Sequence, residues 1–249
     1  MENIKGFGYM NIIPDISKSE GTLKAQRFFK KFTREFVKQS AKYIEFAHEA
    51  TFTYRERQLH TTIAPVLDKI TDAFLFESPV DRNWSKLQKY DYEDSHGWVD
   101  YWCRTKNIDF FIEIKHDYCA YRTGKIRDST IRHWKQATNQ LTTIRNEARK
   151  MSKYSKGSFL LLLHILPIYE TKSIKKEFDS IVNNDKLLLL QKHYHYNLKP
   201  KPNWSSLVVF NNKLVNNFVN EYKEDGRELK QCFPALLFIV RMSNLYKVR

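Results

Sequence analysis

Two short segments near the middle of the chain constrain its fold more than any other feature. Residues 97–103 and 108–115 are rich in aromatic and β-branched side chains, and Lys106-Asn107 lies between them. This composition is typical of β-strands, and the short connection predicts a hairpin. If Lys106-Asn107 forms a two-residue turn, the register places Asp100 directly opposite Glu113.

Amphipathic helices are expected before this hairpin. Apolar residues recur with the helical period over residues 23–50 and again over residues 59–74. Pro65 lies inside the second pattern and is expected to kink or restart that helix. Glu56 lies at the edge of its buried face, where a carboxylate is costly without a cation nearby.

The chain after the hairpin alternates helical and strand patterns. Residues 129–150 predict a helix capped by Asp128 or Ser129, and the apolar run at 159–165 predicts a buried central strand. Residues 77–95 are expected to form a loop. The remaining expected elements are a helix over 174–190 and strands over 207–210 and 235–241. This order predicts an α/β chain with a mixed β-sheet flanked by helices.

The charge of the chain suggests a polyanionic partner. There are 42 Lys and Arg against 28 Asp and Glu, a formal net charge of +14. Residues 121–156 hold ten basic and two acidic residues. Such a surface attracts nucleic acid, although it is also what a Lys-rich protein without such a partner would show. The candidate phosphate contacts, or alternatively a solvated face, are Arg127, Arg132, Lys135 and Arg149.

The carboxylates of the hairpin are the candidate site of chemistry. By strand alternation Asp109, Glu113 and Lys115 share one face. Opposed carboxylates destabilise a sheet unless a cation bridges them, and Mg²⁺ prefers oxygen ligands. A metal beside a lysine suits phosphodiester hydrolysis, because it lowers the pKa of bound water and offsets charge on the phosphate. The alternative is an ordinary charged strip on a half-exposed hairpin.

Glu-x-Lys occurs four times, but only Glu113 sits in an apolar strand with an Asp-bearing strand upstream. This combination resembles the PD-(D/E)XK nuclease superfamily. The matching pieces are Gly97-Trp98-Val99-Asp100, Ile112-Glu113-Ile114-Lys115, the upstream helical Glu56 and a following helix rich in Gln and basic residues. One departure is Val99, which stands where many members have a proline.

The resemblance implies a restriction-endonuclease-like fold and a set of site residues. Asp100, Glu113 and the backbone carbonyl of Ile114 would hold Mg²⁺, with Mn²⁺ as the alternative ion. Glu56 would be an accessory ligand or an acid next to the ligands, and Lys115 the catalytic lysine. Gln136, on the following helix, would point at the site, unless it and Gln140 are only surface residues.

The sequence therefore predicts one nuclease domain over residues 1–249. Residues 1–53 would form an N-terminal helical elaboration, residues 54–166 the nuclease core and residues 167–249 a C-terminal elaboration. The expected activity is metal-dependent cleavage of DNA, in restriction, anti-phage defence or repair. The alternatives are a catalytically inactive nucleic-acid-binding or scaffold subunit of the same fold, and a nuclease that acts on RNA.

Cellular context is constrained by what the sequence lacks. Three scattered cysteines make neither a disulfide framework nor a zinc pattern, and the longest apolar runs are too short for a transmembrane helix. The N-terminus lacks the basic-then-apolar order of a signal peptide. These features predict a reduced, cytoplasmic protein without a membrane partner. Whether it acts as a homodimer or with a partner protein of a multi-subunit system stays open.

Overall fold

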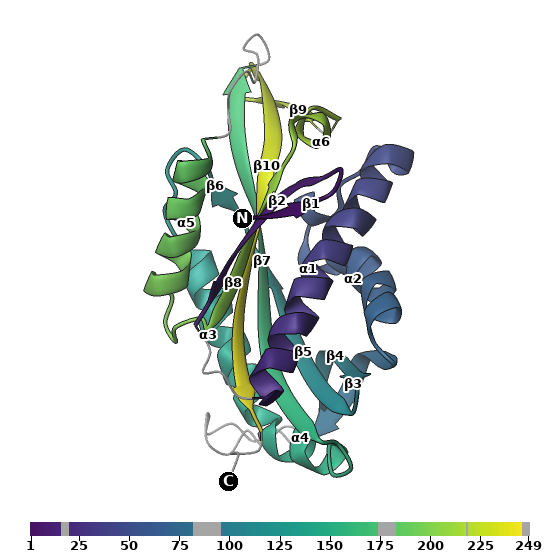
Figure 1. The fold of residues 1–249 in the computed structure, drawn as a ribbon. Coiled ribbons are helices and arrows are strands. Elements are labelled where there is room, and N and C mark those ends of the chain that lie inside the picture. Colours follow the sequence, from purple (N-terminus) through teal and green to yellow (C-terminus); the bar gives the residue numbers. More distant parts are fainter. Residues whose placement is uncertain (16–19, 82–95, 174–182, 218, 246–249) are drawn as a thin grey trace.

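One large sheet organises the molecule. The computed structural model describes residues 1–15, 20–81, 96–173, 183–217 and 219–245 (Figure 1). Its strands are β1 (Glu2–Ile4), β2 (Gly8–Pro14), β3 (Ala73–Asp81), β4 (His96–Thr105), β5 (Ile108–His116), β6 (Cys119–Ala120), β7 (Gly157–Ser173), β8 (Trp204–Phe210), β9 (Val219–Glu224) and β10 (Arg227–Asn244). They join in the order β1-β2-β8-β10-β7-β5-β4-β3, with β6 paired to β7 and β9 to β10.

The sheet is mixed but mostly antiparallel. Strand β7 lies at its centre, parallel to β5 on one side and antiparallel to β10 on the other. The expected hairpin and central strand are thus confirmed as β4, β5 and β7. The C-terminal region does not form a separate layer, because β8 and β10 continue the same sheet.

Helices cover both faces of the sheet. They are α1 (Glu20–Ala47), α2 (Glu56–Ile70), α3 (Asp128–Thr143), α4 (Arg145–Met151), α5 (Asn184–Asn197) and α6 (Asn212–Asn217), with a short 3₁₀ turn at Thr51–Thr53. Helices α1 and α2 lie over one face, and α3 and α5 lie over the other (Figure 1). The α/β class with a mixed sheet between helices is therefore confirmed.

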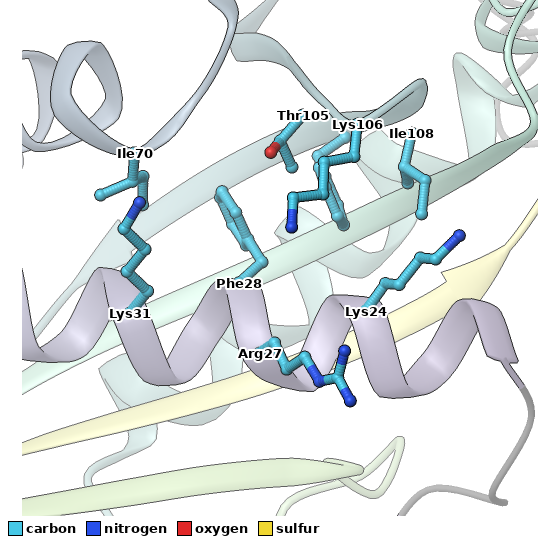
Figure 2. A pocket seen from close by; sticks show the side chains of 9 residues that line it. Lys24, Arg27, Phe28, Lys31, Ile70, Thr105, Lys106 and Ile108 are labelled. Carbon is cyan, nitrogen blue, oxygen red and sulfur yellow. The ribbon is translucent and has the colours of Figure 1, made fainter.

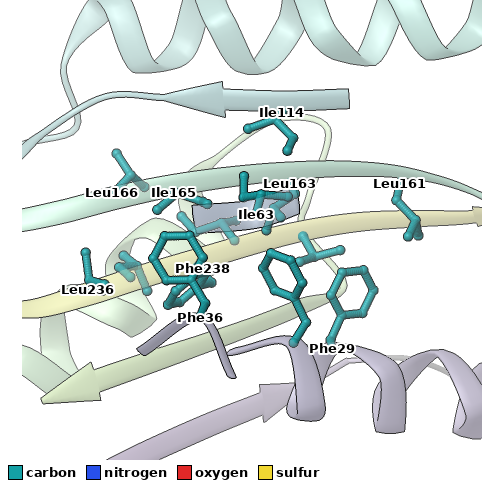
Figure 3. Close-up of a cluster of buried hydrophobic side chains, with 14 of the residues drawn as sticks. Phe29, Phe36, Ile63, Ile114, Leu161, Leu163, Ile165, Leu166, Leu236 and Phe238 are labelled. Atoms are coloured by element: carbon teal, nitrogen blue, oxygen red, sulfur yellow. The ribbon is translucent and has the colours of Figure 1, made fainter. Parts of the chain in front are cut away.

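The main core lies between α1 and the sheet (Figure 3). Phe28 of α1 stacks on Phe110 of β5 with ring centroids 4.5 Å apart, and Phe36 meets Phe238 of β10 edge-on at 5.3 Å. Burying an aromatic side chain of this kind contributes about 2 kcal/mol. The apolar stripe of α1 therefore fixes this helix across the central strands.

Pro65 does not interrupt α2, so the helix does not restart there. The helix continues from Glu56 to Ile70 with Pro65 inside. A proline has no N–H, so the carbonyl of Thr61, four residues earlier, loses its helical donor. The Tyr43 hydroxyl of α1 donates to that carbonyl at 3.1 Å. A side chain from the neighbouring helix thus replaces the missing bond.

The helix expected over 129–150 is instead two helices. Thr138, Thr142 and Thr143 bond back to carbonyls of the preceding turn, at Trp134, Thr138 and Gln140. Such bonds compete with the helical ladder, and α3 ends at Thr143. The N-cap position is Arg127 rather than Asp128 or Ser129. The Ser129 side chain bonds Asp117 instead.

Several other segments differ from the sequence-based expectation. The hairpin of β1 and β2 precedes α1, so the N-terminal region is not purely helical. Phe74 lies in β3 rather than on a helix, and β3 extends over residues expected to be a loop. Residues 82–95, the rest of the loop expected over 77–95, lie outside the described residues. So do residues 174–182, the first part of the helix expected over 174–190.

Candidate active site

The β4–β5 hairpin forms in the predicted register. Lys106 and Asn107 both have positive φ, 50° and 63°, as the tight turns of two-residue hairpins require. Facing pairs run from Thr105↔Ile108 to Tyr101↔Ile112. Continued by one step, this register places Asp100 opposite Glu113.

The two strands stop pairing where the carboxylates begin. Tyr101↔Ile112 is the last pair of the β4–β5 ladder, although β4 starts at His96 and β5 runs on to His116. The Asp100 carboxylate accepts the backbone N–H of Ile114 at 2.6 Å. The Asp100 side chain therefore takes the place of the β4 carbonyl that would accept the Ile114 N–H in a continued ladder. This bond holds the Asp100 carboxylate against β5.

Lys115 lies at the centre of an acidic group. Its Nζ atom is 3.3 Å from Oε1 of Glu113 and 3.4 Å from Oε1 of Glu56. Glu113 and Lys115 are buried at 3% and 8% exposure, whereas Glu56 and Asp100 are partly exposed. Glu56 is the first residue of α2, which covers the face of the sheet opposite to α3 (Figure 1). Its carboxylate reaches Lys115 at the end of the hairpin where β4 and β5 no longer pair.

The charges around Lys115 decide its protonation state. Burial alone would lower the pKa of the Lys115 ammonium, but the carboxylates of Glu113, Glu56 and Asp100 outweigh burial and raise this pKa above its usual value. Lys115 is therefore a cation at neutral pH. Two carboxylates contact this one ammonium and a third, that of Asp100, acts on it electrostatically, so the group keeps an excess of negative charge.

A second polar cluster borders this group, and the sequence reasoning missed it. Asp117 accepts a hydrogen bond from Thr130 of α3 at 3.0 Å, and its Oδ2 lies 3.6 Å from Nδ1 of His133. Burial alone would raise the pKa of the Asp117 carboxyl, but hydrogen bonds from Ser129, Tyr118 and Thr130 hold it below its usual value. The sequence does contain a sign of this cluster: Asp117 lies two residues after Lys115, and Ser129 and Thr130 lie at the start of α3.

His164 lies beside Lys115 in the sheet. The two are register partners on β7 and β5, and His164 is fully buried under the Trp134 ring of α3. Burial lowers the pKa of His164 to about 3. His164 is therefore neutral at physiological pH and adds no positive charge to the acidic group. His116, on the other side of β5, forms a hydrogen bond with the Phe52 carbonyl at 2.9 Å.

An exposed tryptophan stands next to Asp100. Strand alternation puts Trp98, Asp100 and Trp102 on one face of β4. Trp98 is 61% exposed, whereas Trp102 is partly buried with the Arg104 guanidinium 5.4 Å from its ring centroid. A flat aromatic surface thus lies one pleat from the carboxylates, in a position where an unpaired base could stack.

The predicted phosphate contacts are not all placed alike. Arg132, Lys135 and Gln136 are exposed and line one shallow groove on α3, together with Asp128, Ile131 and Asn139. Arg127 donates to the Tyr169 hydroxyl, and Nε of Arg149 donates to the Leu245 carbonyl at 3.2 Å. Gln136 therefore lies with the basic groove, while Asp100, Glu113, Glu56 and Lys115 form the other group.

The donor set around Lys115 suits a hard divalent cation, because it consists of carboxylates in negative excess. Within the described ranges, no three His, Cys, Asp or Glu side chains are arranged to hold a metal ion as they stand. The Lys115 ammonium itself bridges Glu56 and Glu113. The three cysteines, Cys103, Cys119 and Cys232, are buried free thiols.

Comparison with known proteins adds no family to this description. No protein-family model matches the chain, and neither a curated protein nor a solved structure matches it. In the described part of the chain, no helix is both long and apolar enough to span a membrane.

Proposed function

We propose that this chain is a metal-dependent nuclease with a restriction-endonuclease-like fold, and that DNA is its substrate. One observation carries the proposal: at the point where β4 and β5 separate, the carboxylates of Glu113 and Glu56 contact a single buried lysine, and the charge of Asp100 acts on the same ammonium. The order α2, β3, β4, β5, α3, β7, with β7 parallel to β5, supports the resemblance drawn from the sequence.

Each residue of the group would have a distinct role. Asp100, Glu113 and the Ile114 carbonyl would hold Mg²⁺ or Mn²⁺, with Glu56 as the accessory ligand. When bound there, the ion would lower the pKa of a bound water and offset negative charge on the phosphate. The backbone bond from Ile114 to Asp100 keeps the carboxylate directed at β5.

Lys115 would act as a cation rather than as a base. The surrounding carboxylates raise its pKa, so its ammonium has no free lone pair at neutral pH. It can therefore donate hydrogen bonds to a phosphate oxygen and stabilise charge that develops there. This role requires a positive charge at Nζ, which arginine can supply in part and alanine cannot.

The surface supports a nucleic-acid substrate. The net charge of +14 favours a polyanion, and the groove with Arg132 and Lys135 supplies cations on α3, which covers the face of β5 that carries Glu113. Trp98 adds a stacking surface beside Asp100. An inactive nucleic-acid-binding or scaffold subunit would share these surface features, so activity has to decide between the two functions.

Cleavage of a supercoiled plasmid with Mg²⁺, with Mn²⁺ and with EDTA tests the proposal. Wild-type protein should cleave only with metal, and Glu113→Gln should reduce the rate by about a thousandfold. Lys115→Ala should lower the rate more than Lys115→Arg, with nearly unchanged DNA affinity. Asp109→Asn, which changes another buried carboxylate on the same strand, is the control. Because it removes the charged partner of Arg104 it should be less stable, so it is assayed at a temperature where its melting curve shows it to be folded, and there it should stay active.

The outcomes separate the alternatives. Full activity of Glu113→Gln would remove this group as the active site. DNA binding without cleavage in either metal would favour the inactive subunit. Cleavage of RNA but not of DNA under the same conditions would favour the RNA nuclease.

A further inference from the structure

A second pocket lies at the other end of the same hairpin (Figure 2). It has a volume of about 220 Å³ and lies between α1, the end of α2 and the β4–β5 turn. The residues that line it are Lys24, Arg27, Phe28, Lys31, Ile70, Thr105, Lys106, Ile108 and Phe110. Nothing in the carboxylate group around Lys115 contributes to it.

The pocket is lined by four cations and, within the described residues, by no acid. Three other cations of α1 are compensated: Lys30 and Arg34 pair with Glu2, and Lys38 pairs with Glu35. Among the described residues no carboxylate forms an ion pair with Arg27, Lys31 or the ammonium of Lys106. The nearby Asp72 accepts the backbone N–H of Lys106 instead.

The floor of the pocket is apolar. Phe28 and Phe110 are stacked and almost fully buried, and Ile70 and Ile108 complete the floor. In Figure 2 the side chains of Lys31 and Lys106 lie on either side of the Phe28 ring. Clustered cations repel one another, and burial of an apolar surface favours an apolar ligand. The ligand that satisfies both has an anionic group and a flat apolar part.

We propose that this pocket binds a nucleotide, with its phosphate among Lys31, Lys106 and Arg27 and its base or sugar against the apolar floor. The site is separate from the proposed nuclease site. Phe110 and Glu113 lie on opposite faces of β5. Ile108 is seven residues from Lys115, which corresponds to about 23 Å of strand. The inference stands on the pocket alone and does not need the chain to be a nuclease.

Isothermal titration of the full chain with AMP tests the proposal, with adenosine and inorganic phosphate as separate probes. Wild-type protein should bind AMP more tightly than either probe, because each probe meets only half of the pocket. Lys31→Gln and Lys106→Gln should each weaken AMP binding by about three- to tenfold. Lys42→Gln removes the same charge from an exposed position of α1 outside the pocket and should leave the affinity unchanged.

Three results would overturn the proposal. The first is no AMP binding by the wild-type chain at millimolar concentration. The second is inorganic phosphate binding as tightly as AMP, which would indicate a simple anion site. The third is equal weakening by Lys42→Gln, which would indicate attraction by overall charge. A melting curve of each variant shows that it is folded, and two variants on different elements keep the test valid if one fails to fold.

Discussion

Strand β5 carries two buried carboxylates on the same face, and the protein treats them differently. Asp109, near the turn, is fully buried and receives two hydrogen bonds from the Arg104 guanidinium, 2.7 Å from Nε and 3.0 Å from Nη2. The Ser155 hydroxyl also donates to it. Glu113, four residues on, shares the Lys115 ammonium with Glu56 at distances above 3.2 Å.

The difference indicates which carboxylate serves the fold. Asp109 has its own cation in bidentate geometry, in the part of the hairpin where the strands pair, and it joins β5 to the segment before β7. Glu113 contacts Lys115, which also contacts Glu56, where the strands have separated. One-to-one compensation is what stability requires of a buried charge. An excess of carboxylates is what a site for a further cation requires.

The largest expected effect is on stability. Asp109→Asn should reduce the free energy of unfolding by about 2 kcal/mol, because it leaves Arg104 without its charged partner. Glu113→Gln should change it by less than about 1 kcal/mol, since the loss removes repulsion among the carboxylates as well as attraction to Lys115. Urea unfolding of both variants measures the difference. Equal destabilisation by the two variants would make Glu113 a structural residue like Asp109.

The two tryptophans of β4 extend the comparison with a smaller effect. Trp102, beside Arg104, should be structural, whereas Trp98 is exposed beside Asp100. Trp98→Ala should weaken binding of a short single-stranded DNA in EDTA by about tenfold, the loss expected for one stacked base. Trp102→Ala should lower the melting temperature and leave that affinity nearly intact. Fluorescence anisotropy measures the affinity. If Trp102→Ala weakens binding and Trp98→Ala does not, the DNA strand lies toward the Lys106-Asn107 turn instead.

The parts that the sequence could predict are those set by local pattern. The register of β4 on β5 follows from a two-residue turn, and it brought Asp100 and Glu113 together without any tertiary information. The break after Thr143 depends on hydroxyl bonds that no periodicity reveals. The carbonyl that Pro65 leaves without a donor in α2 is bonded by Tyr43 of another helix, which the local sequence does not show. Hairpin β1–β2 pairs with β8, about two hundred residues away, so its strands have little local signal.

The same limit applies to the site. Strand alternation places Asp109, Glu113 and Lys115 on one face. It does not predict that Arg104 pairs with Asp109 rather than with Glu113. The cluster of Asp117 with His133 joins a strand end to a helix, and the cationic pocket joins α1 to the turn. These contacts exist only after the elements pack.

The smallest expected effect is on the salt dependence of DNA binding. It should distinguish basic side chains in the groove on α3 from basic side chains outside it. Arg132 and Lys135 lie in an open groove, whereas Arg149 bonds the Leu245 carbonyl and Lys153 lies over the Tyr154 ring. Each basic side chain that touches a phosphate adds about −0.9 to the slope of log affinity against log salt. Arg132→Gln with Lys135→Gln should therefore make the slope shallower by about two units and weaken binding for all sequences alike.

Arg149→Gln with Lys153→Gln is the matched control, because it removes the same charge from exposed side chains that lie outside the groove and contact other parts of the chain. Its slope should stay close to that of the wild type. Filter binding of duplex DNA across a salt series measures both variants, and cleavage at saturating DNA should persist in each. If the control changes the slope as much as the groove variant, the DNA follows the overall charge of the surface rather than the groove on α3. In that case Arg149 would be a phosphate contact in spite of its bond to Leu245.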